Sequence, residues 1–151
     1  MSDSYQEYEL ACQQERERNS QLLEQFATWL KAKQLTQKTI NNHLTNVDFY
    51  INEFLLYEYP ITEASEGITS VDMYFGYWFI KKAMWASASS IKSNAASLKK
   101  FYSFLHEQGL ISAEDWADLK ETIKDNMSEW QATLRRYDDP DIEDMEEVWG
   151  Y

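Results

Sequence analysis

The segment Ser89-Ser-Ile-Lys-Ser-Asn-Ala-Ala-Ser-Leu-Lys-Lys-Phe-Tyr-Ser-Phe-Leu105 divides into two different faces when it is placed on a helix. One face is apolar and predicts contact with a protein core; it consists of Ile91, Ala95, Leu98, Tyr102 and Leu105. The other face is small, hydroxylated and positively charged; it consists of Ser89, Lys92, Ser93, Ala96, Lys99, Lys100 and Ser103. The second face is either an ordinary solvated surface or one that suits a phosphate backbone lying close against it.

The rest of the chain has the composition of a helical protein with one core. Its 151 residues are 44% hydrophobic and 15% aromatic, and only four glycines and two prolines interrupt its 3.6-residue periodicity. No segment alternates long enough to predict a sheet. We therefore predict an all-α fold, a compact bundle of four to five helices with an extra acidic C-terminal helix.

Caps and breaks in the apolar pattern predict where the helices lie. The predicted helices cover about 20–34, 36–57, 71–85, 89–108 and 112–137. Ser20, Thr36, Ser70 (or Thr69) and Ser112 are the expected N-caps, and Gly109 is the expected residue after a helix C-terminus. The aromatic run in 71–85 predicts a buried central helix rather than a ligand pocket.

These helices give a provisional division of the chain. Residues 1–19 form an N-terminal arm or an extra helix, and residues 20–111 form a helical domain. Residues 112–137 form an acidic amphipathic helix packed on that domain, and residues 138–151 form an acidic tail.

The net charge of −12 is unevenly distributed. Residues 1–30 carry −4, residues 31–110 carry +1, and residues 111–151 carry −9. From Met73 to His106 there are five lysines and no acidic residue. The overall charge therefore does not exclude a nucleic-acid partner, because one region is locally positive.

Two stretches share their order and spacing with a known family. The first is Phe26-Ala-Thr-Trp-Leu30 followed by Leu35-Thr-Gln-Lys-Thr-Ile40. The second runs from Ser90 to Leu105 and continues into Glu107-Gln-Gly-Leu-Ile111. Together they resemble the N-terminal core-binding (SAM-like) domain of the tyrosine recombinase, or phage integrase, family over about residues 20–112.

That resemblance implies a helical domain that forms half of a clamp around duplex DNA. In the family, the start of the second helix and the exposed face of the fourth lie along the DNA. The matching residues here are Thr36, Lys38, Thr39, His43, Ser89, Lys92, Ser93, Ala96, Lys99 and Lys100. Lysine would release counterions, and serine and threonine would donate to phosphate oxygens. Since no arginine lies between Arg18 and Arg135, we expect low sequence specificity.

We expect this module to lack enzymatic activity. The family's catalytic domain, with its Arg, Lys, His and Tyr nucleophile, has no counterpart in the chain. Arg135-Arg136-Tyr137 lies at a predicted helix end beside an acidic tail, which does not favour a catalytic role. The long acidic helix also replaces the linker common in the family, and its charge would repel DNA if it lay near the binding face.

An alternative function belongs to a different class. The chain would be an acidic protein-interaction or DNA-mimic module that binds a basic partner, such as a DNA-binding protein. The nearly all-acidic run from Asp138 to Glu147 precedes Trp149 and Tyr151, two candidate aromatic anchors. This segment would otherwise fold back on the lysine face or remain a solvated tail. A plain helical assembly protein is a third possibility.

The sequence gives no reason to expect a metal, a cofactor or a membrane. The spacings of His43, His106 and Cys12 match no zinc pattern, and the acids from Asp139 to Glu143 lack the glycine of a calcium loop. The longest apolar run, Met73 to Ile80, is too short to span a bilayer. One cysteine and a polar N-terminus lead us to expect a cytoplasmic protein, and leave the oligomeric state open.

Overall fold

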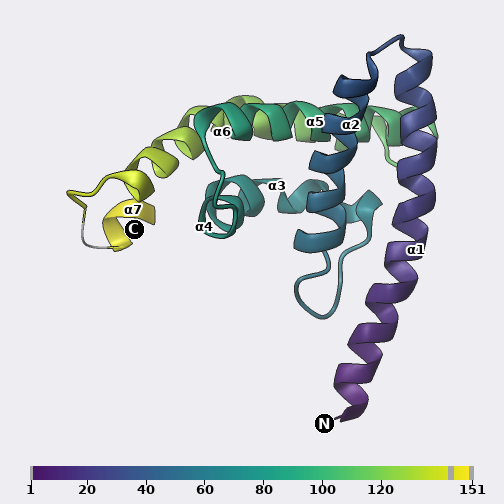
Figure 1. The fold of residues 1–151 in the computed structure, drawn as a ribbon, viewed down its shortest axis with the longest axis horizontal. Helices are drawn as coiled ribbons and strands as arrows, with labels where there is room; N and C mark the ends of the chain where they lie inside the picture. The colour runs from purple at the N-terminus through teal and green to yellow at the C-terminus, as the bar shows by residue number, and fades with distance from the viewer. Residues whose placement is uncertain (1, 143–144, 150–151) are drawn as a thin grey trace.

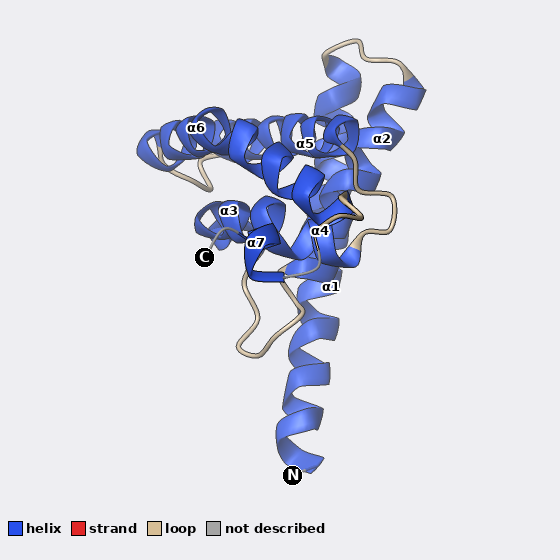
Figure 2. Ribbon diagram, turned by 90° about the vertical axis from the view of Figure 1, so that its left-hand side faces the viewer, coloured by secondary structure: helices blue, strands red, loops and turns tan. Residues whose placement is uncertain are grey.

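The computed structural model describes residues 2–142 and 145–149, and every regular element in these ranges is helical (Figure 2). The predicted all-α class is therefore confirmed. The principal helices are α1 (Ser2–Ala32), α2 (Gln37–Asp48), α5 (Ala88–Glu107) and α6 (Ala113–Asp138). Helices α5 and α6 lie side by side, and α1 and α2 cross them (Figure 1). The N-terminal part of α1 extends well beyond the body of the protein (Figure 2).

Helix α5 forms as the sequence predicts, because both of its ends carry strong signals. The Ser87 hydroxyl accepts from the Ser90 amide, and the Ser90 side chain accepts from the Ser87 amide. At the other end Gly109 has φ +76°, a left-handed conformation that glycine adopts without steric cost. The apolar face is buried as predicted, with Leu98 and Tyr102 at most 1% exposed.

The first helix begins much earlier than predicted. Ser20 is not a cap but lies inside α1, which runs without a break from Ser2 to Ala32. The Asn19 amide explains this result, since it is fully buried and donates to Asn52 Oδ1 (2.8 Å) and to the Ile51 carbonyl (3.3 Å). These tertiary hydrogen bonds outweigh the local tendency of Ser20 to begin a helix. Residues 2–19 therefore continue the first helix.

The middle of the chain is less regular than predicted. After α2, whose predicted cap Thr36 is confirmed, the chain continues as a π-helical segment, η1 (Phe49–Phe54). A 3₁₀ helix, η2 (Ala64–Ser70), occupies part of the expected loop, and Ser70 forms no side-chain cap. The predicted third helix is divided, and its parts are α3 (Val71–Met73), η3 (Tyr74–Trp78) and α4 (Phe79–Lys82). It ends three residues before the predicted end at Trp85.

Helix α6 packs along α5 and adds buried side chains to the same hydrophobic core. Its N-cap Ser112 accepts from the Asp115 amide at 3.0 Å, as predicted. The stripe of Leu119, Ile123, Trp130 and Leu134 is buried, and Trp130 Nε1 donates to Asp72 Oδ1 at 2.8 Å. The short helix α7 (Met145–Trp149) packs on the C-terminal part of α6.

Two buried tyrosines fix η2 to the core. Tyr50 Oη donates to the Gly67 carbonyl, and Tyr102 Oη donates to the Ala64 carbonyl at 2.7 Å. Burial raises the pKa of both phenols, so both stay protonated and remain donors at neutral pH. Because Tyr102 belongs to the apolar face of α5, η2 lies on the buried side of that helix.

Candidate nucleic-acid interface

The three lysines predicted on α5 are exposed and lie on its outward face. Lys92 and Lys100 are eight positions apart, about 12 Å along the helix axis, and Lys99 precedes Lys100. Among the residues that the structure describes, ion pairs are formed by arginines, at Arg16, Arg18 and Arg136, and by no lysine. The α5 ammonium groups are therefore solvated and available to an anionic partner.

Helix α2 packs beside this lysine row through polar side chains. His43 Nδ1 lies 2.8 Å from Ser97 Oγ, and Asn46 Nδ2 donates to Ser97 Oγ at 3.0 Å and to Ser93 Oγ at 3.4 Å. Partial burial and then the charge of Lys100 lower the pKa of His43. His43 is therefore a neutral hydrogen-bonding group near pH 7 rather than a cation.

The start of α2 presents one exposed lysine and two threonine hydroxyls that are already hydrogen-bonded. Thr36 Oγ1 accepts from the Thr39 amide at 3.2 Å and bonds Thr39 Oγ1 at 3.0 Å. Lys38, between them, is exposed. Of the predicted residues here, Lys38 can meet a phosphate directly, whereas the threonines first serve the helix cap.

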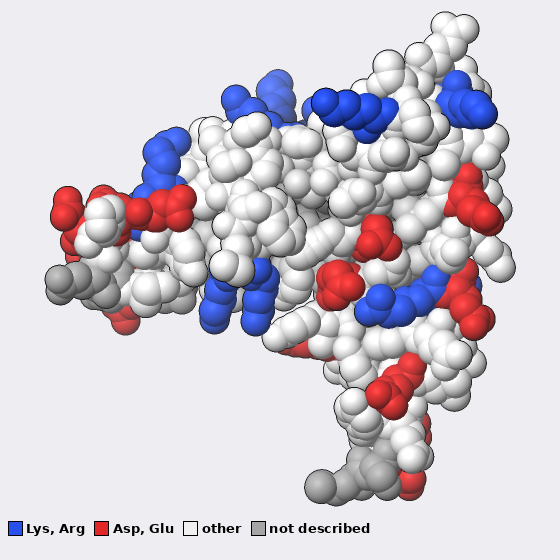
Figure 3. Space-filling model, viewed as in Figure 1, with Lys and Arg blue, Asp and Glu red and all other residues white. Residues whose placement is uncertain are grey.

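We call the combined surface the α2–α5 face. It consists of Thr36, Lys38, Thr39, His43, Asn46, Ser89, Lys92, Ser93, Ala96, Lys99 and Lys100, and the buried Ser97 lies beneath it. Ser97 was missed by the sequence reasoning because it lies at the seam between the two faces of α5. Ser93 and Ser97 are four residues apart, so they are neighbours on one side of the helix, and this spacing is the sequence signal that could have identified Ser97. In Figure 3, several lysines and arginines appear along the upper edge of the view, where α5, α6 and the tops of α1 and α2 lie, and others appear at the lower edge and beside carboxylates.

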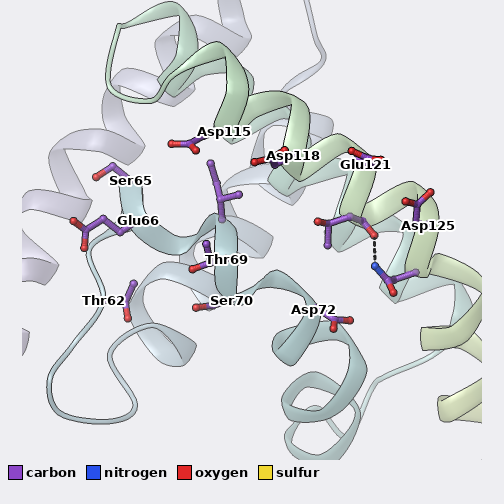
Figure 4. Close-up of a pocket in the computed structure, with 13 residues that line it drawn as sticks. Thr62, Ser65, Glu66, Thr69, Ser70, Asp72, Asp115, Asp118, Glu121 and Asp125 are labelled. Atoms are coloured by element: carbon purple, nitrogen blue, oxygen red, sulfur yellow. Dashed lines mark hydrogen bonds between the residues drawn. The ribbon is translucent and has the colours of Figure 1, made fainter.

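The acidic residues of α6 face a different part of the protein. A groove of about 950 Å³ lies between α6 and the η2–α3 segment, and none of the described residues that line it is a lysine or an arginine. Its six carboxylates are those of Glu66, Asp72, Asp115, Asp118, Glu121 and Asp125 (Figure 4). Hydroxyl groups from 62–70 complete the lining. We call this the acidic groove.

The α2–α5 face and the acidic groove have no residue in common. The η2 wall of the groove is bonded to Tyr102, which belongs to the buried face of α5, whereas the lysines belong to its exposed face. On α6, Lys120 and Lys124 occupy the flank away from the groove, with Lys120 Nζ 4.8 Å from the centre of the Trp116 ring. The carboxylates of α6 that line the groove and the two lysines of α6 therefore lie on different flanks of the helix.

The C-terminal aromatic anchor predicted at Trp149 is engaged within the protein. Its ring lies 4.6 Å from that of Tyr77 and 5.7 Å from that of Tyr137, centre to centre. Arg136 Nε donates to the Val148 carbonyl at 2.9 Å, which ties α7 to α6 rather than to the lysines of α5. Tyr151, the other predicted anchor, lies outside the described residues.

Other kinds of site find little support in the described ranges. No group of three or more histidine, cysteine, aspartate or glutamate side chains there is arranged to hold a metal ion. None of the helices in 2–142 and 145–149 combines the length and apolarity that crossing a bilayer requires. Arg136, part of the Arg-Arg-Tyr sequence considered above, bonds Glu129, Thr133 and Val148.

Comparison with known proteins adds no further assignment. No protein-family model, curated protein or solved structure matches this chain.

Proposed function

We propose that this protein is a non-catalytic module that binds the phosphate backbone of duplex DNA through the α2–α5 face, with low sequence specificity. The observation that carries the proposal is the row of three exposed α5 lysines beside Lys38 of α2, none of which has a carboxylate partner among the residues that the structure describes. A duplex presents one negative charge for about every 1.7 Å of its axis, so a 12 Å row of lysines faces several phosphates. The resemblance to a recombinase core-binding domain is consistent with this surface but remains part of the proposal.

The clustering of α6 carboxylates in the acidic groove weakens the main objection to DNA binding. Exposed charges interact weakly beyond about 8 Å at physiological ionic strength. The groove carboxylates come from η2, α3 and α6 and line a hollow that none of the α5 lysines lines. The described acids of α7 lie at the far end of α6 (Figure 1).

The test is a fluorescence anisotropy titration of a labelled random-sequence duplex from about 50 to 200 mM salt. Each lost phosphate contact reduces the slope of log K against log salt by about 0.9, so the Lys99→Gln/Lys100→Gln variant should lose about 1.8. The matched control is Lys81→Gln/Lys82→Gln, which removes the same charge from α4. Absence of binding at the lowest salt, or equal effects of the two pairs, would refute the proposal.

A second candidate is binding of a basic protein segment in the acidic groove. The observation that favours it is a concave surface with six carboxylates and no basic residue in its lining. Titration with an arginine-rich peptide tests it. Asp118→Asn/Glu121→Gln should weaken peptide binding and leave duplex binding unchanged. A peptide affinity unaffected by this pair would eliminate this candidate.

A further inference from the structure

A separate pocket of about 440 Å³ lies between residues 54–62 and the η3–α4 segment. Its walls include Tyr57, Met73, Tyr77 and Trp78. The side chains of Tyr57 and Met73 are exposed, and Tyr77 and Trp78 are partly buried. The aromatic run that predicted only a buried helix therefore also presents part of its surface to solvent.

Two lysines of α4 stand at this pocket beside the tyrosines. Lys81 Nζ lies 3.2 Å from Tyr77 Oη and 5.4 Å from the centre of that ring. Lys82 Nζ lies 3.3 Å from Tyr57 Oη and 5.3 Å from the centre of the Tyr57 ring. The hydrogen bond to Tyr77 raises the pKa of Lys81, so its charge is retained at neutral pH.

The pocket is richer in cations than in anions. Glu58 is the one carboxylate in its lining, and neither lysine forms an ion pair within the described ranges. The indole N–H of Trp78 is buried and has no acceptor among the described residues, although buried N–H groups are nearly always paired. The pocket thus offers two cations and aromatic walls to a ligand that is both aromatic and anionic.

We infer that this pocket binds one unpaired nucleotide of a single nucleic-acid strand, with the base against the aromatic walls and a phosphate on Lys81 and Lys82. Paired aromatic and lysine groups are how proteins hold single strands without reading their sequence. In a duplex the bases are stacked inside and cannot reach such walls. The pocket volume falls within the ordinary range for small-molecule sites. This inference stands apart from the duplex surface, since it rests on other residues on other helices.

The test separates base contacts from phosphate contacts. The probes are a labelled oligothymidylate, an abasic oligomer of the same length, and free thymidine monophosphate. We expect the oligothymidylate to bind at least about tenfold more tightly than the abasic oligomer, in keeping with the strength of base–aromatic stacking. Weak competition by the free nucleotide is expected, because it offers one phosphate and no neighbouring strand.

Variants then locate the site. Lys81→Gln/Lys82→Gln and Tyr57→Leu should each weaken oligothymidylate binding about tenfold. Both sites are exposed, so circular dichroism should show an unchanged fold. Lys99→Gln/Lys100→Gln, which tests the duplex surface, removes phosphate contacts only and should weaken the oligothymidylate and the abasic oligomer by the same factor, so the preference for the oligothymidylate stays unchanged. The inference would be overturned by equal affinities for the oligothymidylate and the abasic oligomer, or by a Lys81→Gln/Lys82→Gln variant that binds oligothymidylate as tightly as the wild type. It would also be overturned if an acidic tyrosine-containing peptide bound more tightly than the oligothymidylate and its binding depended on the same lysines.

Discussion

Gly67 occupies a position in η2 where no side chain fits. A Cβ atom added there would lie 2.5 Å from Tyr102 Oη, 2.8 Å from Leu55 Cδ1 and 3.2 Å from Tyr50 Cε2. Carbon atoms normally approach to about 3.5–4.0 Å. All three neighbours are buried, so they have little room to move away. We therefore predict that Gly67→Ala strongly destabilises the protein.

The magnitude follows from the contacts that must change. Overpacking of a core costs about 1–3 kcal/mol. Displacing Tyr102 also breaks its hydrogen bond to Ala64, which leaves a buried carbonyl unpaired at a cost of about 1–3 kcal/mol. The expected loss is therefore about 2–6 kcal/mol of the free energy of unfolding. For a chain of this size that corresponds to a fall in Tm of roughly 5–20 °C.

Urea and thermal unfolding, followed by circular dichroism, measure this loss. The matched control is Gly109→Ala, because Gly109 has φ +76° and no atom within 4 Å of its added Cβ. That change costs only backbone strain, about 1–2 kcal/mol. If Gly67→Ala destabilises the protein no more than Gly109→Ala does, the packing argument for η2 is wrong.

Three further predictions concern single side chains. The buried Tyr74 hydroxyl has no partner among the described residues, so Tyr74→Phe should raise the free energy of unfolding by about 1 kcal/mol. Tyr102→Phe removes the hydrogen bond to the Ala64 carbonyl and should lower the free energy of unfolding by a similar amount. Urea unfolding of the two variants distinguishes the two signs. The pKa of His43 is lower in the folded protein than its usual 6.5, so the unfolded chain protonates His43 at a higher pH than the folded protein does. The free energy of unfolding should therefore decline as the pH falls below about 6.5. This decline should be smaller in His43→Gln, as chemical unfolding between about pH 7.5 and 5.5 would measure. Arg136→Ala removes the bond to the Val148 carbonyl but leaves the contacts of Trp149 with Tyr77 and Tyr137, so α7 should open more often without detaching. Limited proteolysis should then cut before α7 faster than in the wild type, with a global stability loss of only about 1–2 kcal/mol.

The predictions from sequence succeeded where a long apolar period met clear caps. Three features were predicted correctly: the buried face of α5, the end of α5 before Gly109, and the start of α6 after Ser112. Each depends on residues that lie within one or two helical turns of one another. Local chemistry fixes such features, because the cap and the helix it begins are neighbours in sequence.

The predictions failed where distant residues decide local structure. Ser20 has the chemistry of a cap, yet the buried hydrogen bonds of Asn19 to the 51–52 backbone and side chain hold α1 continuous across it. The π-helical turns of η1 and η3 carry no local signal of this kind, and they adjust aromatic rings that pack together, such as Tyr50 and Tyr74 at 4.7 Å.

The candidate surfaces show the same division. The lysines of α5 were predicted from periodicity alone, because an exposed helix face needs no partner. The pairing of His43 with Ser97 and the meeting of Tyr57 with Lys82 join residues 54 and 25 positions apart, so a single sequence could not place them together. The internal docking of Trp149 likewise depends on Tyr77, a residue far away in the chain.

The separate clustering of the α5 lysines and of the carboxylates in the acidic groove makes the charge distribution uneven, in addition to the net charge of −12. Molecules with uniform negative charge repel one another more as salt is removed, because screening weakens. Molecules of this protein can instead orient so that the lysines of one approach the groove of another. Its osmotic second virial coefficient should therefore rise less steeply at low ionic strength than the net charge predicts. Neutralising the α5 lysines should restore simple repulsion, even though it makes the protein more negative.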